Sequence, residues 1–360
     1  MEQALLFAIL VVFPVGQLWG HLPLDILVGA AAFYGILANR KRALVFGIFA
    51  PFVLAAVFSY FLSVGVIKNP DLIKGGLYLW RLVAFWFFGD WIVNLVKKKP
   101  ELKDLIAKSL IAMGVITALF GWWQYWRYPD LTALKYLGWD DHLYRLVGTF
   151  LDPGFTALFL VFGAVLSFGT GWILPLFFTV SLAFTYSRAG YLAFWAAMLA
   201  LAFLRQKEKA FLLAIALVAA ICFLPHPAGE GVNLARTYSV VSRGENYLQT
   251  LAMALKTPVF GVGYNNLCIY KGGLGGHACS GADASLLLIL ATTGLVGLTL
   301  FIRAVFRLGQ RFKKGPYFIP LVASAVALAT HSLLVNSLLY PFTVVFFSLL
   351  LSLQTFKEKN

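Results

Sequence analysis

The sequence predicts an all-α polytopic membrane protein with about twelve transmembrane helices, and three observations support this fold class. Hydrophobic residues make up 61% of the 360 residues and charged residues only 12%, whereas charged residues are about a quarter of a soluble domain. Apolar runs of roughly 17 to 25 residues, long enough to cross a bilayer, recur along the chain. Clusters of Lys and Arg alternate with these runs. The whole chain, 1–360, is therefore expected to form a single transmembrane domain.

The apolar runs are separated by short polar segments, with one long loop as the exception. The first run lacks a basic amino end and a following Ala-x-Ala site, so we expect it to be a span and not a cleaved signal peptide. The sixth and seventh runs are joined only by Phe168-Gly169-Thr170-Gly171. The predicted spans lie at about 4–19, 22–38, 43–66, 76–96, 104–124, 150–168, 170–186, 188–204, 208–225, 284–304, 316–335 and 337–356.

The formal net charge of +14 is explained by membrane topology and does not require a nucleic-acid partner. If the amino terminus is cytoplasmic, 18 of the 29 Lys and Arg residues fall in cytoplasmic clusters, as the positive-inside rule requires. This places both termini on the cytoplasmic side of the cytoplasmic (inner) membrane. The clusters are Asn39–Arg42, Lys97–Lys108, Arg205–Lys209, Arg303–Lys314 and Lys357–Lys359.

The long loop, 226–283, is expected to be an extracytoplasmic subdomain that contains a short interfacial helix. Ser242 and Glu245 have the spacing of a capping box, which predicts a helix that begins near Arg243. Apolar residues then recur at helical spacing until Thr257-Pro258 ends the helix, because proline cannot continue it. Such a helix lies with one face in lipid or against the spans. Its amino end would suit an anion such as a phosphate. The apolar side comprises Tyr247, Leu248, Leu251, Ala252 and Leu255.

Single arginines stand at span ends on the predicted outer side, where they oppose the usual charge bias. These residues are Arg81, Arg145, Arg188 and Arg243. An arginine at the edge of a membrane is costly unless it has a partner, so each one is a candidate functional residue. Each could instead extend its side chain to the lipid head groups. If several converge on one outer cavity, they would bind a polyanion such as a lipid pyrophosphate.

Few residues in the long loop could act as a general base. Asp283 stands at the start of the tenth span and His277 lies six residues before it. Either an aspartate or a histidine can accept the proton of an acceptor hydroxyl. Asp283 could instead cap the tenth span, as Asp152 followed by Pro153 is expected to cap the sixth.

The cysteines do not indicate a metal site. Cys222, Cys268 and Cys279 lack metal-ligand spacing, and we expect neither a metal nor another cofactor. Cys268 and Cys279 could form a disulfide if the long loop is outside the cell.

Four motifs in the second half of the chain resemble those of the O-antigen ligase and O-antigen polymerase superfamily, membrane enzymes that transfer glycans from a polyprenyl pyrophosphate carrier. The motifs occur in the same order as in the family. They are Arg145-Leu-Val-Gly-Thr-Phe150 followed by Pro153, Thr185-Tyr-Ser-Arg188-Ala-Gly190, Arg243 through Pro258 to the turn Gly261-Val-Gly263, and Leu287 through Thr293-Gly294-Leu295-Val-Gly297-Leu298.

The resemblance implies a GT-C-like fold and an inverting, metal-independent glycosyltransferase of the outer membrane face. Its substrates would be a polyprenyl-pyrophosphate-linked glycan and an acceptor glycan or glycolipid, as in a surface polysaccharide polymerase or ligase. Arg145, Arg188 and Arg243 would bind the pyrophosphate, and Asp283 or His277 would be the catalytic base. The chain departs from the family at two places: Asp283-Ala284 stands where a His-Asn pair is usual, and Gly154 where asparagine is common.

A transporter or flippase of lipid-linked glycans is the alternative interpretation. It would also need many spans and a basic cavity. Repeat symmetry between the two halves and polar residues deep in the spans would be expected of a transporter, and neither is evident in the sequence.

Overall fold

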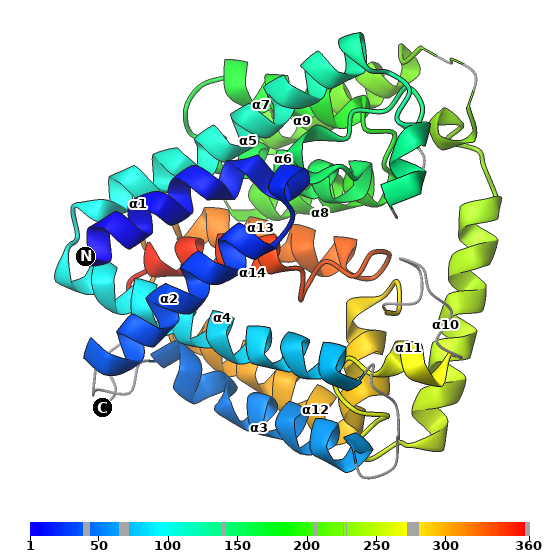
Figure 1. Cartoon of the computed structure of the whole chain (residues 1–360). Coiled ribbons are helices and arrows are strands. Elements are labelled where there is room, and N and C mark those ends of the chain that lie inside the picture. Colours follow the sequence, from blue (N-terminus) through cyan, green and yellow to red (C-terminus); the bar gives the residue numbers. More distant parts are fainter. Residues whose placement is uncertain are drawn as a thin grey trace.

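The computed structural model describes residues 1–38, 44–64, 72–137, 142–204, 207–225, 227, 229–271 and 281–356. Within these ranges the chain is helical, apart from loops and two isolated β-bridges, and the helices pack into one bundle (Figure 1). Helices are expected here because a backbone in lipid must satisfy its hydrogen bonds internally. The predicted all-α class is confirmed for the described residues.

Every predicted apolar run contains a helix. Among the described residues, five helical segments are long and apolar enough to cross a membrane: Glu2–Trp19, Gly47–Val64, Gly75–Lys98, Leu102–Arg127 and Ser285–Gln310. The total of twelve crossings stays a prediction. The helices of the predicted runs are α1 (Glu2–Val12) with the 3-10 helix η1 (Phe13–Trp19), α2 (Leu22–Ala38), α3 (Leu44–Val64), α4 (Leu72–Lys98), α5 (Leu102–Arg127), α6 (Pro153–Leu166), α7 (Ile173–Ala183), α8 (Arg188–Leu204), α9 (Lys207–Cys222), α12 (Ser285–Gln310), α13 (Phe318–His331) and α14 (Pro341–Ser352).

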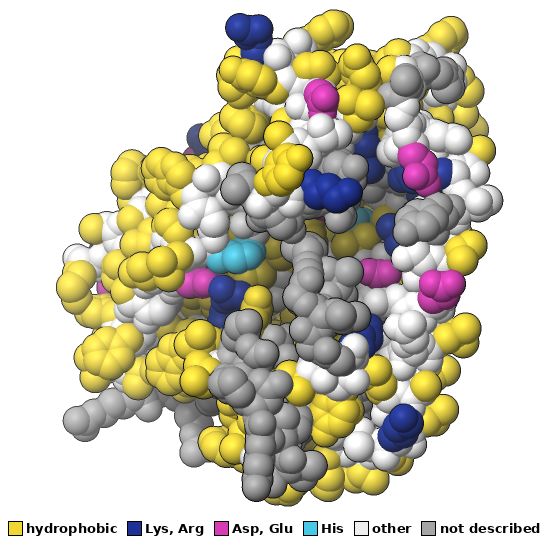
Figure 2. Space-filling model, turned by 45° about the vertical axis from the view of Figure 1, so that its right-hand side comes forward, with side chains coloured by type: hydrophobic (Ala, Val, Ile, Leu, Met, Phe, Trp, Pro, Cys, Tyr) yellow, Lys and Arg dark blue, Asp and Glu magenta, His cyan; other side chains and the backbone are white. Residues whose placement is uncertain are grey.

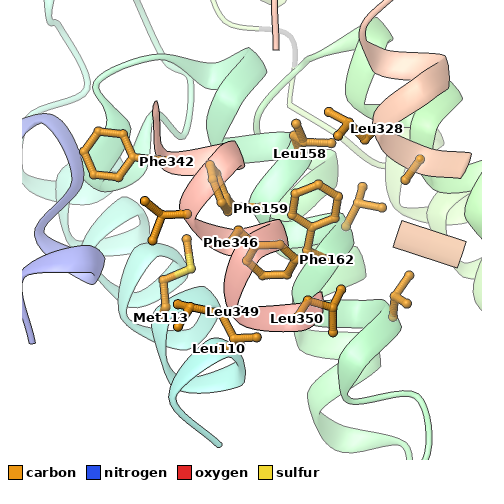
Figure 3. Packing of buried hydrophobic residues seen from close by; sticks show 14 of the residues in the cluster. Leu110, Met113, Leu158, Phe159, Phe162, Leu328, Phe342, Phe346, Leu349 and Leu350 are labelled. Carbon is orange, nitrogen blue, oxygen red and sulfur yellow. The ribbon is translucent and has the colours of Figure 1, made fainter. Parts of the chain in front are cut away.

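Helix α14 lies at the centre of the bundle and is packed by aromatic side chains (Figure 3). Phe346 stacks on Phe162 of α6 with ring centroids 4.5 Å apart, and Phe342 stacks on Phe13 of η1 at 6.0 Å. All four rings are fully buried. Lipid is as apolar as these rings, so close packing and not removal from water holds such helices together.

The segments assigned to the two sides of the membrane meet at opposite ends of the bundle. At one end, the Lys97 ammonium lies 5.5 Å from the centroid of the Phe356 ring, and Lys313 N donates to Thr355 O at 2.8 Å. Three predicted cytoplasmic segments are thus adjacent. The predicted outer segments meet at the other end, around the cavity described below. Which end faces the cytoplasm stays a prediction.

The long loop contains the amphipathic helix α10 (Tyr238–Lys256), together with the short helices η4 (Glu230–Val232) and α11 (Leu267–Tyr270). The predicted start near Arg243 is wrong, because α10 begins at Tyr238 and its N-cap, Thr237, makes no side-chain cap hydrogen bond. The predicted end before Pro258 is confirmed. Figure 1 shows α10 running crosswise to α3, α4 and α12 at their ends. Leu248 and Leu255 are each 70% exposed, as expected of a face that contacts lipid.

Helix α12 is broken at Gly294, where the turn that follows α10 inserts its backbone. Gly294 has φ 67° and ψ −171°. Leu295 N donates to Pro258 O at 2.8 Å, and Val296 N donates to Val259 O at 3.2 Å. The turn therefore accepts hydrogen bonds from amides that the break removes from the helix, which is what allows irregular backbone inside a helix bundle in a membrane. The motif that ends in the turn Gly261-Val-Gly263 and the motif that contains Gly294 are thus joined by backbone hydrogen bonds.

Candidate active site

A cavity of about 510 Å³ opens at the end of the bundle where α10 lies. Part of its lining comes from the amino ends of α6 and α8, the inner side of α10, the segment before α12, and the segment between α13 and α14. On this face of the molecule, dark blue Lys and Arg side chains surround a hollow, with acidic side chains among them (Figure 2). The volume is in the range of small-molecule sites.

Four candidate residues that are distant in sequence share this cavity. Arg145, Arg188, Arg243 and Asp283 all line it. The fifth, His277, lies outside the described residues, as does Cys279, the candidate disulfide partner of Cys268. The structure thus brings the predicted arginines together, while their roles stay predictions. Cys268 is disulfide-bonded, and its predicted pairing with Cys279 stays a prediction.

Arg145 holds the turn that leads into α8. Its Nε donates to Thr185 O at 3.0 Å and its Nη2 to Tyr186 O at 3.4 Å. Tyr186 has a positive φ of 51°, a conformation that is costly for a bulky residue and that persists only where its surroundings impose it. Arg145 therefore contributes both charge to the cavity and support to the backbone before Arg188.

Arg188, the first residue of α8, holds the segment that leads into α10. Its Nη1 donates to Arg236 O at 2.9 Å and to Leu234 O at 3.3 Å, and its Nη2 donates to Ser239 Oγ. Because one planar guanidinium makes all three contacts, a lysine could not replace it.

Arg243 and Arg236 extend the cluster. Arg243 lies in the second turn of α10 and not at its amino end, so the predicted anion site at that helix end is not where this arginine stands. Its guanidinium has no hydrogen-bond or ion-pair partner within the described ranges, and it faces the cavity. Arg236 also lines the cavity and donates to Gly231 O and Asn233 O. Sequence reasoning missed Arg236, although it is a further lone arginine in the outer loop.

Four positive charges lie close together on one side of the cavity. They belong to Arg145, Arg188, Arg236 and Arg243, which are called the arginine wall below. Burial, followed by the charges of Arg188 and Arg243, lowers the pKa of the Arg236 guanidinium. Like charges this close repel each other unless an anion lies between them. The arginine wall therefore has the electrostatics of a site for a multiply charged anion.

Asp283 lies in the cavity on the amino side of α12. It does not cap this helix, since the N-cap is Ala284 and no side-chain cap hydrogen bond is present there. Its backbone N donates to Asn246 Oδ1 of α10 at 3.1 Å. Lys271 is nearby: burial lowers the pKa of its ammonium, and the Asp283 charge opposes that shift. By contrast, Asp152 does cap α6, since its Oδ1 accepts from Phe155 N at 2.7 Å.

His142 is a buried imidazole that lines the cavity, and it was not predicted as a site residue. It is 5% exposed, and its Nδ1 is without a hydrogen-bond partner among the residues described. Burial, with the Arg145 charge as the second cause, lowers the pKa of His142 to about 3. It is therefore neutral at pH 7 and too weak a base to hold a proton there. It can only donate or accept a hydrogen bond.

Residues 172–302 match the family model described as O-antigen ligase. This match confirms the resemblance to the O-antigen ligase and polymerase superfamily. It includes Arg188, Arg236, Arg243 and Asp283, while Arg145 lies outside it. A comparison with curated proteins finds no match.

Proposed function

Because residues 172–302 match the O-antigen ligase family, we propose that this protein is a membrane glycosyltransferase of the outer face of the cytoplasmic membrane. It moves a glycan from a polyprenyl-pyrophosphate carrier to an acceptor sugar hydroxyl. The observation that carries the proposal is the arginine wall, which shares one cavity with the carboxylate of Asp283. Both termini are cytoplasmic in this scheme.

The arginine wall binds the pyrophosphate of the donor. Guanidinium groups form short, charge-assisted hydrogen bonds to phosphate oxygens. Arg243 has donor groups available, while Arg145 and Arg188 already bind backbone carbonyls and are therefore fixed in position. Such preorganised positive charge stabilises the pyrophosphate as it leaves, and it does so without a metal ion.

Asp283 is the proposed general base. The acceptor oxygen forms a new bond to the anomeric carbon as the bond from that carbon to the pyrophosphate oxygen breaks, so the configuration inverts. The electron pair of the broken bond goes to the pyrophosphate, and the acceptor proton goes to the Asp283 carboxylate. His277 is the alternative base.

Helix α10 ties this site to the bilayer. Its inner side presents Arg243 to the cavity, while Leu248 and Leu255 are exposed on its outer side. A helix with these two faces lies at the membrane interface. The polyprenyl chain of the donor can then remain in lipid while its pyrophosphate reaches the cavity.

The test is transfer by purified protein in lipid nanodiscs that contain a polyprenyl-pyrophosphate oligosaccharide, with and without added acceptor. Arg188→Ala and Arg243→Ala should abolish transfer. Arg127→Ala is the matched control, because Arg127 lies at the outer end of α5, is exposed and does not line the cavity. Wild-type product length and yield in both cavity variants would refute the proposal. Movement of the lipid-linked glycan across the membrane without transfer would also refute it and favour the transporter.

A further inference from the structure

A second wall of the cavity is built by parts of the chain outside the matched residues 172–302. It comprises Gln17 of η1, His21, Tyr78 and Arg81 of α4, and Tyr340 before α14, and is called the N-terminal wall below. The proposed function assigns no role to these residues.

The N-terminal wall is polar but carries no uncompensated cluster of charge. Its arginine, Arg81, forms an ion pair with the Asp25 carboxylate of α2 and lies over the Tyr78 ring, 4.9 Å from its centroid. Only Nη2 of the guanidinium is used in the ion pair, so Nε and Nη1 retain donors that no described residue accepts. Unlike the arginine wall, this surface suits a neutral ligand with many hydroxyl groups.

Gln17 is held in one orientation. The residue is 5% exposed, and its Nε2 donates to Tyr340 OH at 2.9 Å and lies 2.9 Å from His21 Nδ1. Because both contacts use the amide nitrogen, Oε1 is left as an acceptor with no donor among the described residues. Tyr340 is itself fixed, since its ring stacks on Phe155 at 3.9 Å. A fixed planar amide beside aromatic rings is the type of surface that recognises sugar hydroxyls and the apolar face of a sugar ring.

The reaction geometry separates the two substrates. In an inverting displacement the acceptor oxygen approaches the anomeric carbon from the side opposite the leaving pyrophosphate. If the arginine wall binds the pyrophosphate, the acceptor must lie toward the surface that lacks the arginine cluster. Of the surfaces that line the cavity, the N-terminal wall is the one that meets this requirement, because it lines the cavity and lacks the arginine cluster.

We propose that Gln17, Tyr78, Arg81 and Tyr340 form a subsite for the terminal sugar of the acceptor glycan. The inference rests on the proposed function in one respect, that the bound sugar belongs to the acceptor. The binding of a sugar at this wall can be measured by itself. The subsite takes a neutral, polyhydroxylated sugar: the Tyr78 ring packs on its face, Arg81 donates to its oxygens and Gln17 Oε1 accepts from its hydroxyls.

The direct experiment is saturation-transfer NMR on the full chain in nanodiscs. The probe is the free oligosaccharide released by mild acid from the lipid-linked glycan of the source cells, so it carries no pyrophosphate. Tyr78→Ala and Gln17→Ala should lose the signal, and Tyr78→Phe should keep it because the ring remains. Trp80→Ala is the matched control, since Trp80 lies two residues from Tyr78 on α4, is 71% exposed and does not line the cavity. Arg243→Ala should also keep the signal.

Kinetics supply the second measurement. Tyr78→Ala should raise the KM for the acceptor by about tenfold, the effect of losing one favourable contact, with an unchanged KM for the lipid-linked donor. Wild-type saturation transfer in both Tyr78→Ala and Gln17→Ala, or no saturation transfer in the wild-type protein, would overturn the subsite. If the NMR result holds but no transfer occurs, the sugar subsite stands and the proposed function fails.

Discussion

Replacing Gly294 by alanine is expected to destabilise the junction between α12 and the turn that follows α10. With φ 67° and ψ −171°, Gly294 occupies a region that is nearly exclusive to glycine and that costs other residues ~1–3 kcal/mol. An added Cβ would also lie 2.1 Å from Val259 O. The turn must then move, and the bonds from Leu295 N and Val296 N are lost, each worth about 0.5–1.5 kcal/mol. Together these terms lower the free energy of unfolding by ~2–6 kcal/mol.

The measurement is thermal unfolding in detergent or nanodiscs, followed by size-exclusion chromatography with fluorescence detection. Gly309→Ala is the matched control, because Gly309 lies in the same helix and nothing stands within 4 Å of its added Cβ. That variant should be neutral or slightly more stable, since alanine is the better helix former. Equal unfolding temperatures for Gly294→Ala and Gly309→Ala would refute the argument that the break at Gly294 is fixed by the inserted turn.

Three further predictions follow from the contacts in the cavity. Arg188→Lys should weaken donor binding and make residues 229–237 more sensitive to limited proteolysis, because lysine cannot make the three contacts; unchanged proteolysis would contradict this. His142 is neutral when folded, so the unfolded chain takes up one more proton between pH 6.5 and about 3, and stability should fall on acidification by up to ~1.4 kcal/mol per pH unit. His142→Gln should remove that slope in urea unfolding, and an unaltered slope would show that His142 is not its source. Asn246→Ala should lower kcat without weakening donor binding, since Asn246 positions Asp283; a raised donor KM with normal kcat would argue against this role.

The sequence predicted those parts of the site that depend on interactions within one helical turn or on the cost of a charge at the membrane edge. The Asp152-Pro153 start of α6 was predicted because an aspartate cap and a proline at the first helical position act within one turn. Single arginines could be identified at Arg145, Arg188 and Arg243 because a charge at a membrane edge is costly wherever the chain then folds.

The features that were predicted wrongly or not predicted depend on contacts between segments that are distant in sequence. Ser242 and Glu245 have the spacing of a capping box, but α10 continues back to Tyr238, and Arg188 of another helix binds the carbonyls just before that start. No local pattern contains this contact. Gln17 and Tyr78 were not predicted for the same reason, because only the packing of η1 and α4 brings them to the cavity.

The break in α12 explains how a loop outside the spans can hold groups with the accuracy that catalysis requires. The turn after α10 is bonded to the backbone of α12, and Ser59 Oγ of α3 contacts both Phe260 O, at 2.6 Å, and Thr292 O, at 2.7 Å. Just before the start of α12, the backbone N of Asp283 donates to Asn246 Oδ1 of α10. Helix α10 is therefore attached to α12 at two points, through Asn246 in its middle and through the turn that follows its last residue, and both points lie on the carboxyl side of Arg243. Catalysis by positioned charge needs the Arg243 guanidinium and the Asp283 carboxylate to remain fixed as the leaving group departs. These attachments hold the inner side of α10 in place while its outer side contacts the membrane interface.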